Sequence, residues 1–119
     1  MDERSIMESL MAVIAERKAR PPSERSYVAD LLRGGVAKIG AKIVEEAAEV
    51  VEAGGEDGEA GREHLVREVA DLVFHAAVLL GYRDLSWTAV ENELGRRFGV
   101  SGIAEKEARK HSKERQAEA

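Results

Sequence analysis

The sequence predicts an all-α fold, a helical bundle with a central antiparallel helix pair that is completed by dimerisation. Its 119 residues are only 4% aromatic and include two prolines, whereas alanine, leucine, valine and glutamate are abundant. Apolar residues recur at helical spacing, and no segment alternates with the period of two that is typical of a strand. These observations favour helices over a sandwich or a barrel.

The first predicted helix begins with a capping box, Ser5-x-x-Glu8, whose hydroxyl and carboxylate satisfy main-chain donors. Its apolar positions fall at helical spacing, and it ends near Arg17-Lys18, before Pro21-Pro22. After a polar loop and Ser26-Tyr27, a turn-length apolar piece spans residues 28–32. We expect a break at Gly34-Gly35.

The next two predicted helices form the central pair. One covers about residues 36–53 and stops in the connection GGEDGEAG, and the other covers about residues 63–80, with Gly81 as its stop. Ser86 caps a fourth helix, 87–98, which Gly99 ends. Residues 1–110 are expected to form one domain, and residues 111–119 a charged tail that is frayed or disordered.

Composition excludes several classes of function. The chain has no cysteine, so disulfides, thiol catalysis and thiolate zinc sites are excluded. A net charge of −5 argues against binding to a nucleic-acid backbone, although local basic pockets can still bind a phosphorylated small molecule. No apolar run approaches the roughly 20 residues of a membrane span, and the first ten residues carry acid where a signal peptide carries base. We therefore expect a cytoplasmic protein without membrane partners.

One side of the helix over residues 36–53 is acidic. Lys42, Glu45, Glu46 and Glu49 share this side, opposite an apolar side that includes Val44. Alone, this is an ordinary amphipathic helix with a solvated face. However, Glu45 and Glu49 are like charges four residues apart, and no basic residue follows Lys42 within the helix. From this helix alone, a solvated surface and a ligand-binding surface both remain open.

The helix over residues 63–80 has a different pattern. In its segment VADLVFHAAVLL the polar side chains are Asp71 and His75, and apolar residues occupy every side, so we expect much of its circumference to be buried. Glu68, Asp71 and His75 fall on one side. A buried carboxylate without compensation costs several kcal/mol, so it must be protonated, paired or metal-bound. The acidic side of the preceding helix can approach it only across a positive charge, which Mg²⁺ or Mn²⁺ supplies.

The histidines narrow the choice of metal. His75 is either a hydrogen-bonded core residue, which can orient Asp71 or an adjacent helix, or a metal ligand, and the sequence favours the core residue. A diiron bundle is disfavoured because it needs Glu-x-x-His on each of two helices, and no histidine has glutamate three positions before it. HExxH is also absent. The sequence therefore predicts a metal that prefers oxygen ligands.

Two motifs in these helices resemble the signature of the all-α nucleoside triphosphate pyrophosphohydrolase superfamily. They are KxxEEAxEV at residues 42–50 and ExADLxFH at residues 68–75. Within the superfamily, the chain is most similar to the phosphoribosyl-ATP pyrophosphohydrolase family of histidine biosynthesis. This narrower resemblance rests on ERK at 16–18, SYVADLLRGGVAKIGAK at 26–42 and RRFGVSGIAEKEAR at 96–109.

The resemblance implies hydrolysis of phosphoribosyl-ATP to phosphoribosyl-AMP and pyrophosphate with Mg²⁺, and Mn²⁺ as the alternative ion. It implies Glu46, Glu49, Glu68 and Asp71 as metal ligands, Glu45 for a second metal or the attacking water, and Lys42 to neutralise phosphate or hold the acidic face. Metal and carboxylates can align a water without a covalent nucleophile. The candidates for phosphate contacts are Arg17, Lys18, Lys38, Arg97, Lys106 and Arg109.

Two alternatives remain open at this point. One is a housecleaning hydrolase of noncanonical nucleoside triphosphates, which shares the acidic signature but not the SY and SGxxEKxxR strings. The other is a noncatalytic helical dimerisation module with a solvated acidic surface. The sequence favours the phosphoribosyl-ATP hydrolase, acting as a homodimer.

Overall fold

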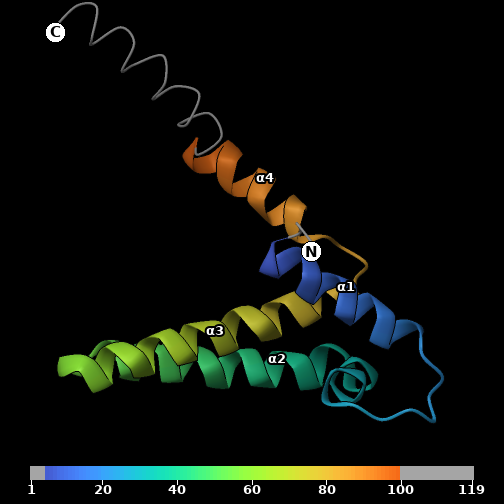
Figure 1. Cartoon of the computed structure of the whole chain (residues 1–119), viewed down its shortest axis with the longest axis horizontal. Helices are drawn as coiled ribbons and strands as arrows, with labels where there is room; N and C mark the ends of the chain where they lie inside the picture. Colours follow the sequence, from blue (N-terminus) through green and yellow to red (C-terminus); the bar gives the residue numbers. More distant parts are fainter. Residues whose placement is uncertain (1–4, 100–119) are drawn as a thin grey trace, which may run out of the picture. The chain divides into compact units, whose positions relative to one another are not determined.

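The computed structural model describes residues 5–99 and divides the chain into two compact units, Met1–Leu85 and Ser86–Ala119. All regular structure within residues 5–99 is helical (Figure 1), which confirms the predicted all-α class. The first unit contains α1 (Ile6–Ala19), α2 (Tyr27–Gly54) and α3 (Gly58–Tyr82), and the second contains α4 (Trp87–Phe98). None of these helices is both long and apolar enough to cross a membrane. The predicted domain boundary at residue 110 and the tail lie outside the described residues.

Serine residues are the N-caps of three of the helices. The hydroxyls of Ser5, Ser26 and Ser86 accept hydrogen bonds from main-chain N–H groups three residues later, at 3.1, 3.0 and 3.1 Å. Gly99 ends α4 in the left-handed conformation, with φ of 64°. The caps predicted at Ser5 and Ser86 and the stop at Gly99 are therefore confirmed.

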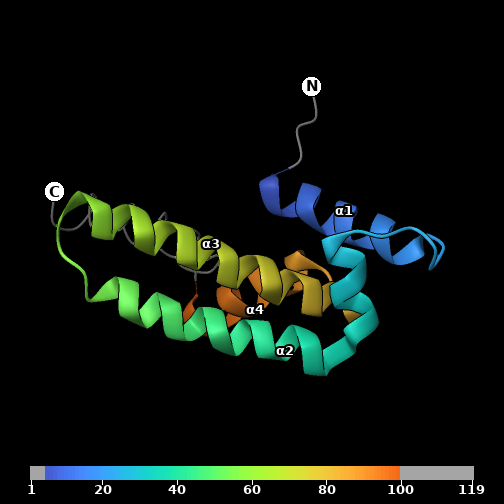
Figure 2. The ribbon, with the colours of Figure 1, turned by 90° about the horizontal axis from the view of Figure 1, so that it is seen from below.

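Gly35 bends α2. The chain is helical on both sides of this residue, but Gly35 itself has φ of 65° and ψ of −160°, a conformation that essentially only glycine adopts. The predicted break is thus a kink inside one helix. In Figure 2 the segment of α2 before the kink runs steeply to the long segment that lies along α3. This turn returns Tyr27 toward α3.

The bounds predicted for α3 were too narrow at both ends. The helix begins at Gly58, directly after Asp57, which is the N-cap and has an extended backbone. The sequence GEAG forms the first turn, where the negative charge of Glu59 interacts favourably with the helix dipole. It continues through Gly81 to Tyr82. Lys18 binds this end, with its Nζ 3.2 Å from the Gly81 oxygen and 2.8 Å from the Tyr82 oxygen. The acidic connection between α2 and α3 therefore shrinks to residues 55–57.

The apolar core lies where α1 covers the antiparallel pair of α2 and α3 (Figure 2). Its buried members come from all three helices: Ile14, Leu31, Leu32, Ile39, Ala77 and Val78.

Toward the α2–α3 connection, the pair instead exposes valines, with Val44 at 70%, Val51 at 77% and Val66 at 69%. The prediction that much of the circumference of α3 is buried holds for residues 72–80, which are buried or half-buried, but it fails nearer the connection, where Val69 is 41% exposed. The physical reason is that α1 covers only one end of the pair.

Candidate metal centre

Two stripes of residues at seven-residue spacing face each other along the central pair. Ile39, Glu46 and Ala53 are the buried positions of the long segment of α2. Gly61 and His75 are buried on α3, with Glu68 midway between them. Seven residues are about two helical turns, so each set forms one line along its helix. The antiparallel arrangement places the two glutamates opposite each other in an otherwise mostly apolar contact.

Three carboxylates meet at this point. Oxygen atoms of Glu46, Glu68 and Asp71 all lie within 4.8 Å of one another. The side chains of Glu46 and Glu68 are only 8% and 13% exposed, whereas Asp71 is exposed. The structure therefore brings the two acid motifs together, with Asp71 at the edge toward solvent.

The burial of Asp71 was predicted wrongly, because its side chain is exposed, whereas the acidic side of α2 does approach α3, as the metal-site interpretation of the sequence required. The apolar Val44 and Val51 are exposed, while the acidic Glu46 is buried. The physical reason is the packing of α3 along the line of Ile39, Glu46 and Ala53, which does not coincide with the most apolar side of the helix. The buried charge is thus carried by one glutamate from each helix.

Glu49 also belongs to this group, which we call the acid cluster: Glu46, Glu49, Glu68 and Asp71. The neighbouring Glu49 carboxyl raises the pKa of Glu68, and burial raises it further, followed by smaller contributions from Glu46 and Asp71. Since metal binding needs the ionised carboxylate, a cation must compete with this proton. The acid cluster therefore concentrates negative charge that favours either a proton or a cation.

Two buried oxygens in the acid cluster have no partner. Among the described residues, Oε2 of Glu46 and Oε2 of Glu68 make no hydrogen bond. An unsatisfied buried acceptor typically costs about 1–3 kcal/mol, and more when it is charged. Lys42 compensates part of this charge, with its Nζ 3.3 Å from Glu45 Oε2 and 3.9 Å from Glu46 Oε1. An all-oxygen ligand set with unpaired atoms fits a hard divalent cation.

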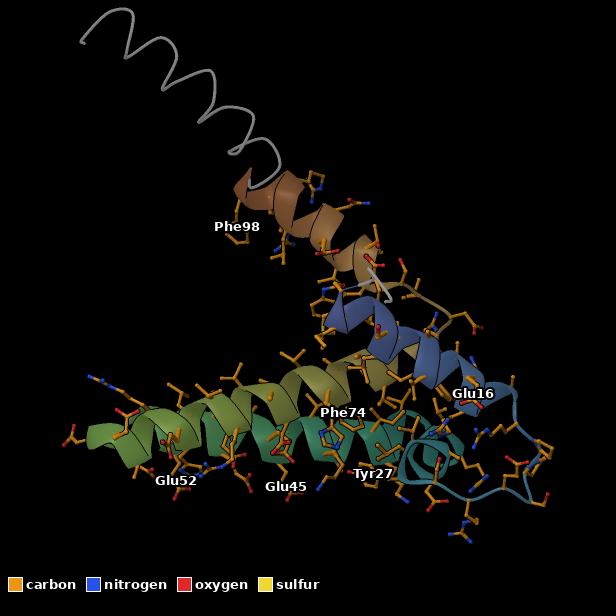
Figure 3. All side chains as sticks on the ribbon, viewed as in Figure 1. Glu16, Tyr27, Glu45, Glu52, Phe74 and Phe98 are labelled. Atoms are coloured by element: carbon orange, nitrogen blue, oxygen red, sulfur yellow. The ribbon has the colours of Figure 1, made fainter. Side chains whose placement is uncertain are left out.

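His75 forms a bridge beside the acid cluster. Its Nδ1 donates to the main-chain oxygen of Asp71 at 2.8 Å, because a carbonyl can only accept. Nε2 then accepts from the hydroxyl of Tyr27, at 2.7 Å. Tyr27 and Phe74, both labelled in Figure 3, stack with ring centres 6.1 Å apart. His75 thus makes the contacts of a hydrogen-bonded core histidine, and it holds the main chain of Asp71 rather than its carboxylate.

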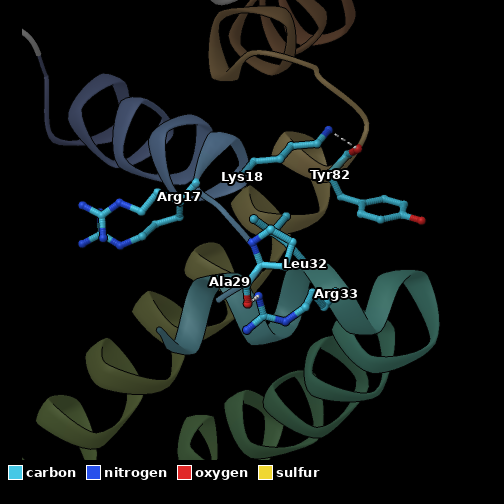
Figure 4. Close-up of a pocket in the computed structure, with 8 residues that line it drawn as sticks. Arg17, Lys18, Ala29, Leu32, Arg33 and Tyr82 are labelled. Carbon is cyan, nitrogen blue, oxygen red and sulfur yellow. Dashed lines mark hydrogen bonds between the residues drawn. The ribbon is translucent and has the colours of Figure 1, made fainter. Parts of the chain in front are cut away.

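The predicted phosphate-binding residues are spread over the chain. Arg17 and Lys18 line a cavity of about 220 Å³ together with Arg33 and Tyr82 (Figure 4). Because Lys18 is bound at the end of α3, this cavity lies about three helical turns from Asp71. The structure does not bring these two residues to the acid cluster.

Of the other four predicted basic residues, the structure describes Lys38 and Arg97. Lys38 is exposed on α2, one turn before Lys42. Arg97 belongs to α4 in the second unit, where its Nε lies 2.9 Å from Glu93 Oε2. Lys106 and Arg109 lie outside the described residues.

Sequence reasoning missed two residues beside the acid cluster. Tyr27 lies beside the acid cluster through His75, to which its hydroxyl donates. His64 was tested only as a diiron ligand, yet its Nε2 lies 3.2 Å from Glu68 Oε1. Its spacing of four residues from Glu68 on one helix was a signal that could have identified it.

An antiparallel helix pair with an acid cluster that fits a divalent cation is the arrangement of the all-α nucleoside triphosphate pyrophosphohydrolases. Residues 7–98 match the family model described as phosphoribosyl-ATP pyrophosphohydrolase, and the chain belongs to this family. The resemblance seen in the sequence is therefore confirmed.

Curated relatives carry the name phosphoribosyl-ATP pyrophosphatase. The chain is 54% identical over 104 residues to the protein of Geotalea daltonii, covering 87% of this chain and 94% of the relative. It is 50% identical over 110 residues to the protein of Geobacter metallireducens, with 92% and 97% covered. With the protein of Rhodopirellula baltica it is 44% identical over 108 residues, with 91% and 89% covered. The similarity thus extends over nearly the whole length of each relative.

Proposed function

We propose that the chain hydrolyses the α,β phosphoanhydride of phosphoribosyl-ATP to phosphoribosyl-AMP and pyrophosphate, the second step of histidine biosynthesis. Family membership and the names of the relatives support this substrate. The structural observation that carries the proposal is that Glu46, which is buried, and Glu68, which is partly buried, each have a buried Oε2 without a partner. Such a pair suits a site that binds a divalent cation against a polyphosphate.

In this proposal the acid cluster holds Mg²⁺, with Mn²⁺ as the alternative. When bound, the cation neutralises charge on the phosphate oxygens. Glu45 is more than half exposed and lies beside Lys42, so it can orient the attacking water or serve a second cation. Lys42 then balances charge on the acid cluster or on phosphate, and His75 fixes the main chain that carries Asp71.

Six basic residues are proposed to bind the phosphates and ribose phosphate of the substrate: Arg17, Lys18, Lys38, Arg97, Lys106 and Arg109. The position of Lys38, one turn from Lys42 on the same helix and exposed, supports a role next to the acid cluster. Arg17 and Lys18 would act at the far end of the central pair, where they line the cavity shown in Figure 4.

The functional form is proposed to be a homodimer. Exposed valines on α2 and α3, including Val44, Val51, Val66 and Val69, leave apolar surface that a second copy can cover. Sedimentation at micromolar concentration is expected to give twice the 13.0 kDa mass of one chain. A strictly monomeric species would contradict this.

The activity is tested by incubating the pure protein with phosphoribosyl-ATP or with ordinary nucleoside triphosphates and assaying pyrophosphate. We expect release from phosphoribosyl-ATP that requires added Mg²⁺ and stops when the metal is chelated. Release from ordinary triphosphates but not from phosphoribosyl-ATP would favour the housecleaning hydrolase. No release from either, with stability unaffected by Mg²⁺, would favour the noncatalytic module.

A further inference from the structure

The side chain of His64 contacts both the α2–α3 connection and the acid cluster. Its Nδ1 lies 2.8 Å from Glu56 Oε1, in the connection, and its Nε2 lies 3.2 Å from Glu68 Oε1. The side chains of Glu56, His64 and Glu68 are 41%, 29% and 13% exposed, so the contact runs from the surface toward the interior. Each ring nitrogen of His64 therefore faces a carboxylate oxygen, and because a carboxylate only accepts, His64 holds both of them as the imidazolium, in which both nitrogens donate.

Glu56 is itself held in place by the backbone around it. Its N–H donates to the Ala53 oxygen at the end of α2, at 3.1 Å. Its own main-chain oxygen lies against Gly61 on α3, where an added β-carbon would come within 2.6 Å. Because Gly61 has no side chain, the connection can pack directly on the first turns of α3. The Glu56 carboxylate is thus presented to His64 from a fixed backbone.

The contact between His64 and Glu68 gives the two carboxylate oxygens of Glu68 different surroundings. Oε1 faces His64, whereas Oε2 is buried and has no partner among the described residues. A free glutamate side chain loses rotamer freedom when it becomes a ligand, and a carboxylate already held in place loses less. Residues that hold a metal ligand in orientation typically change metal affinity by about 10–100-fold when removed.

We propose that His64, supported by Glu56, is a positioning residue that holds Glu68 Oε1 and so directs Oε2 into the acid cluster. This inference rests on the proposed metal site, because it assigns His64 a role toward that site. His64 does not bind the cation itself. It acts through Glu68, from one helical turn away on α3.

The test measures Mn²⁺ binding to the full chain by electron paramagnetic resonance, without substrate. We expect His64→Leu, which removes both ring nitrogens, to weaken Mn²⁺ binding about tenfold or more. We expect His64→Gln to stay within about threefold of the wild type, because its amide nitrogen can donate from nearly the position of Nε2. Arg62→Gln is the matched control, since Arg62 is 81% exposed and the change removes a positive charge from the same part of α3.

The outcomes separate this inference from the proposed function. Wild-type protein that binds no Mn²⁺ would overturn the metal site, and the inference with it. If the wild type binds but His64→Leu binds equally or more tightly, the inference alone is overturned. It is also overturned if His64→Gln is as weak as His64→Leu, since the donor would then not be what matters.

Glu56→Leu provides a second variant should His64→Leu fail to fold. Glu56 lies in the connection and is partly exposed, and this variant changes no residue of α3. We expect a weaker loss of Mn²⁺ affinity, roughly threefold, because His64 remains but loses its support. Affinity equal to that of the wild type would contradict the role given to Glu56.

Discussion

Replacing Glu46 by glutamine is expected to lower pyrophosphate release by at least about 100-fold and to stabilise the metal-free protein. The loss of activity follows because Glu46 is a proposed metal ligand whose Oε2 is unpaired. The gain in stability follows because the Glu46 side chain is only 8% exposed and lies next to other carboxylates. A glutamine of the same shape is neutral and so removes a buried negative charge. We expect the free energy of unfolding without metal to rise by about 1–2 kcal/mol.

The measurement compares urea unfolding of wild type and Glu46→Gln, each with and without Mg²⁺. The wild type should gain stability with Mg²⁺, and the variant should lose most of that gain. Glu52→Gln is the control, since Glu52 is exposed on the same helix (Figure 3) and the change removes the same charge. If Glu46→Gln kept both the activity and the Mg²⁺ effect, Glu46 would not be a ligand.

The opposite effects expected at Glu46 reflect its place in the α2–α3 contact. At positions 39 and 53 the same line carries Ile39 and Ala53, which are buried apolar residues. An apolar residue at position 46 would continue that line, so the acid there is unfavourable for packing alone. Residues that lower stability at a buried position are expected where a function requires them.

The helices could be predicted from local patterns because capping and apolar spacing act over a few residues. Ser5, Ser86 and Gly99 lie where their side chains or backbone satisfy helix ends. The start of α3 could not be predicted, because glycines at 58 and 61 indicate a loop locally. The close packing of Glu56 on Gly61 is a contact between segments that local sequence does not reveal.

The site could be predicted in part. The acid motifs come together as expected, since antiparallel helices joined by a short connection must face each other. Which acid is buried depends on which residues of α2 pack against α3. The buried positions of α2 include Glu46, in line with Ile39 and Ala53. Tyr27 could not be placed beside His75, which is far away in sequence, because the position of Tyr27 depends on the backbone angles that Gly35 adopts in the kink of α2.

Ile14→Ala is expected to lower the free energy of unfolding by about 2–5 kcal/mol. Ile14 is fully buried and is the contribution of α1 to the core formed with Leu31, Ile39 and Val78. Removing its side chain leaves a cavity where α1 meets the central pair. Since small domains have about 5–15 kcal/mol in total, this one change is expected to remove a large part of the stability.

Val13→Ala is the matched control, because Val13 is the preceding residue of the same helix and is 42% exposed. We expect it to change the free energy of unfolding by less than about 1 kcal/mol in a urea titration. Because α1 covers the end of the pair away from the acid cluster, folded Ile14→Ala should bind Mn²⁺ like the wild type. Equal stability of the two variants would contradict the packing of α1, whereas weakened Mn²⁺ binding by folded Ile14→Ala would show that the core and the acid cluster are coupled.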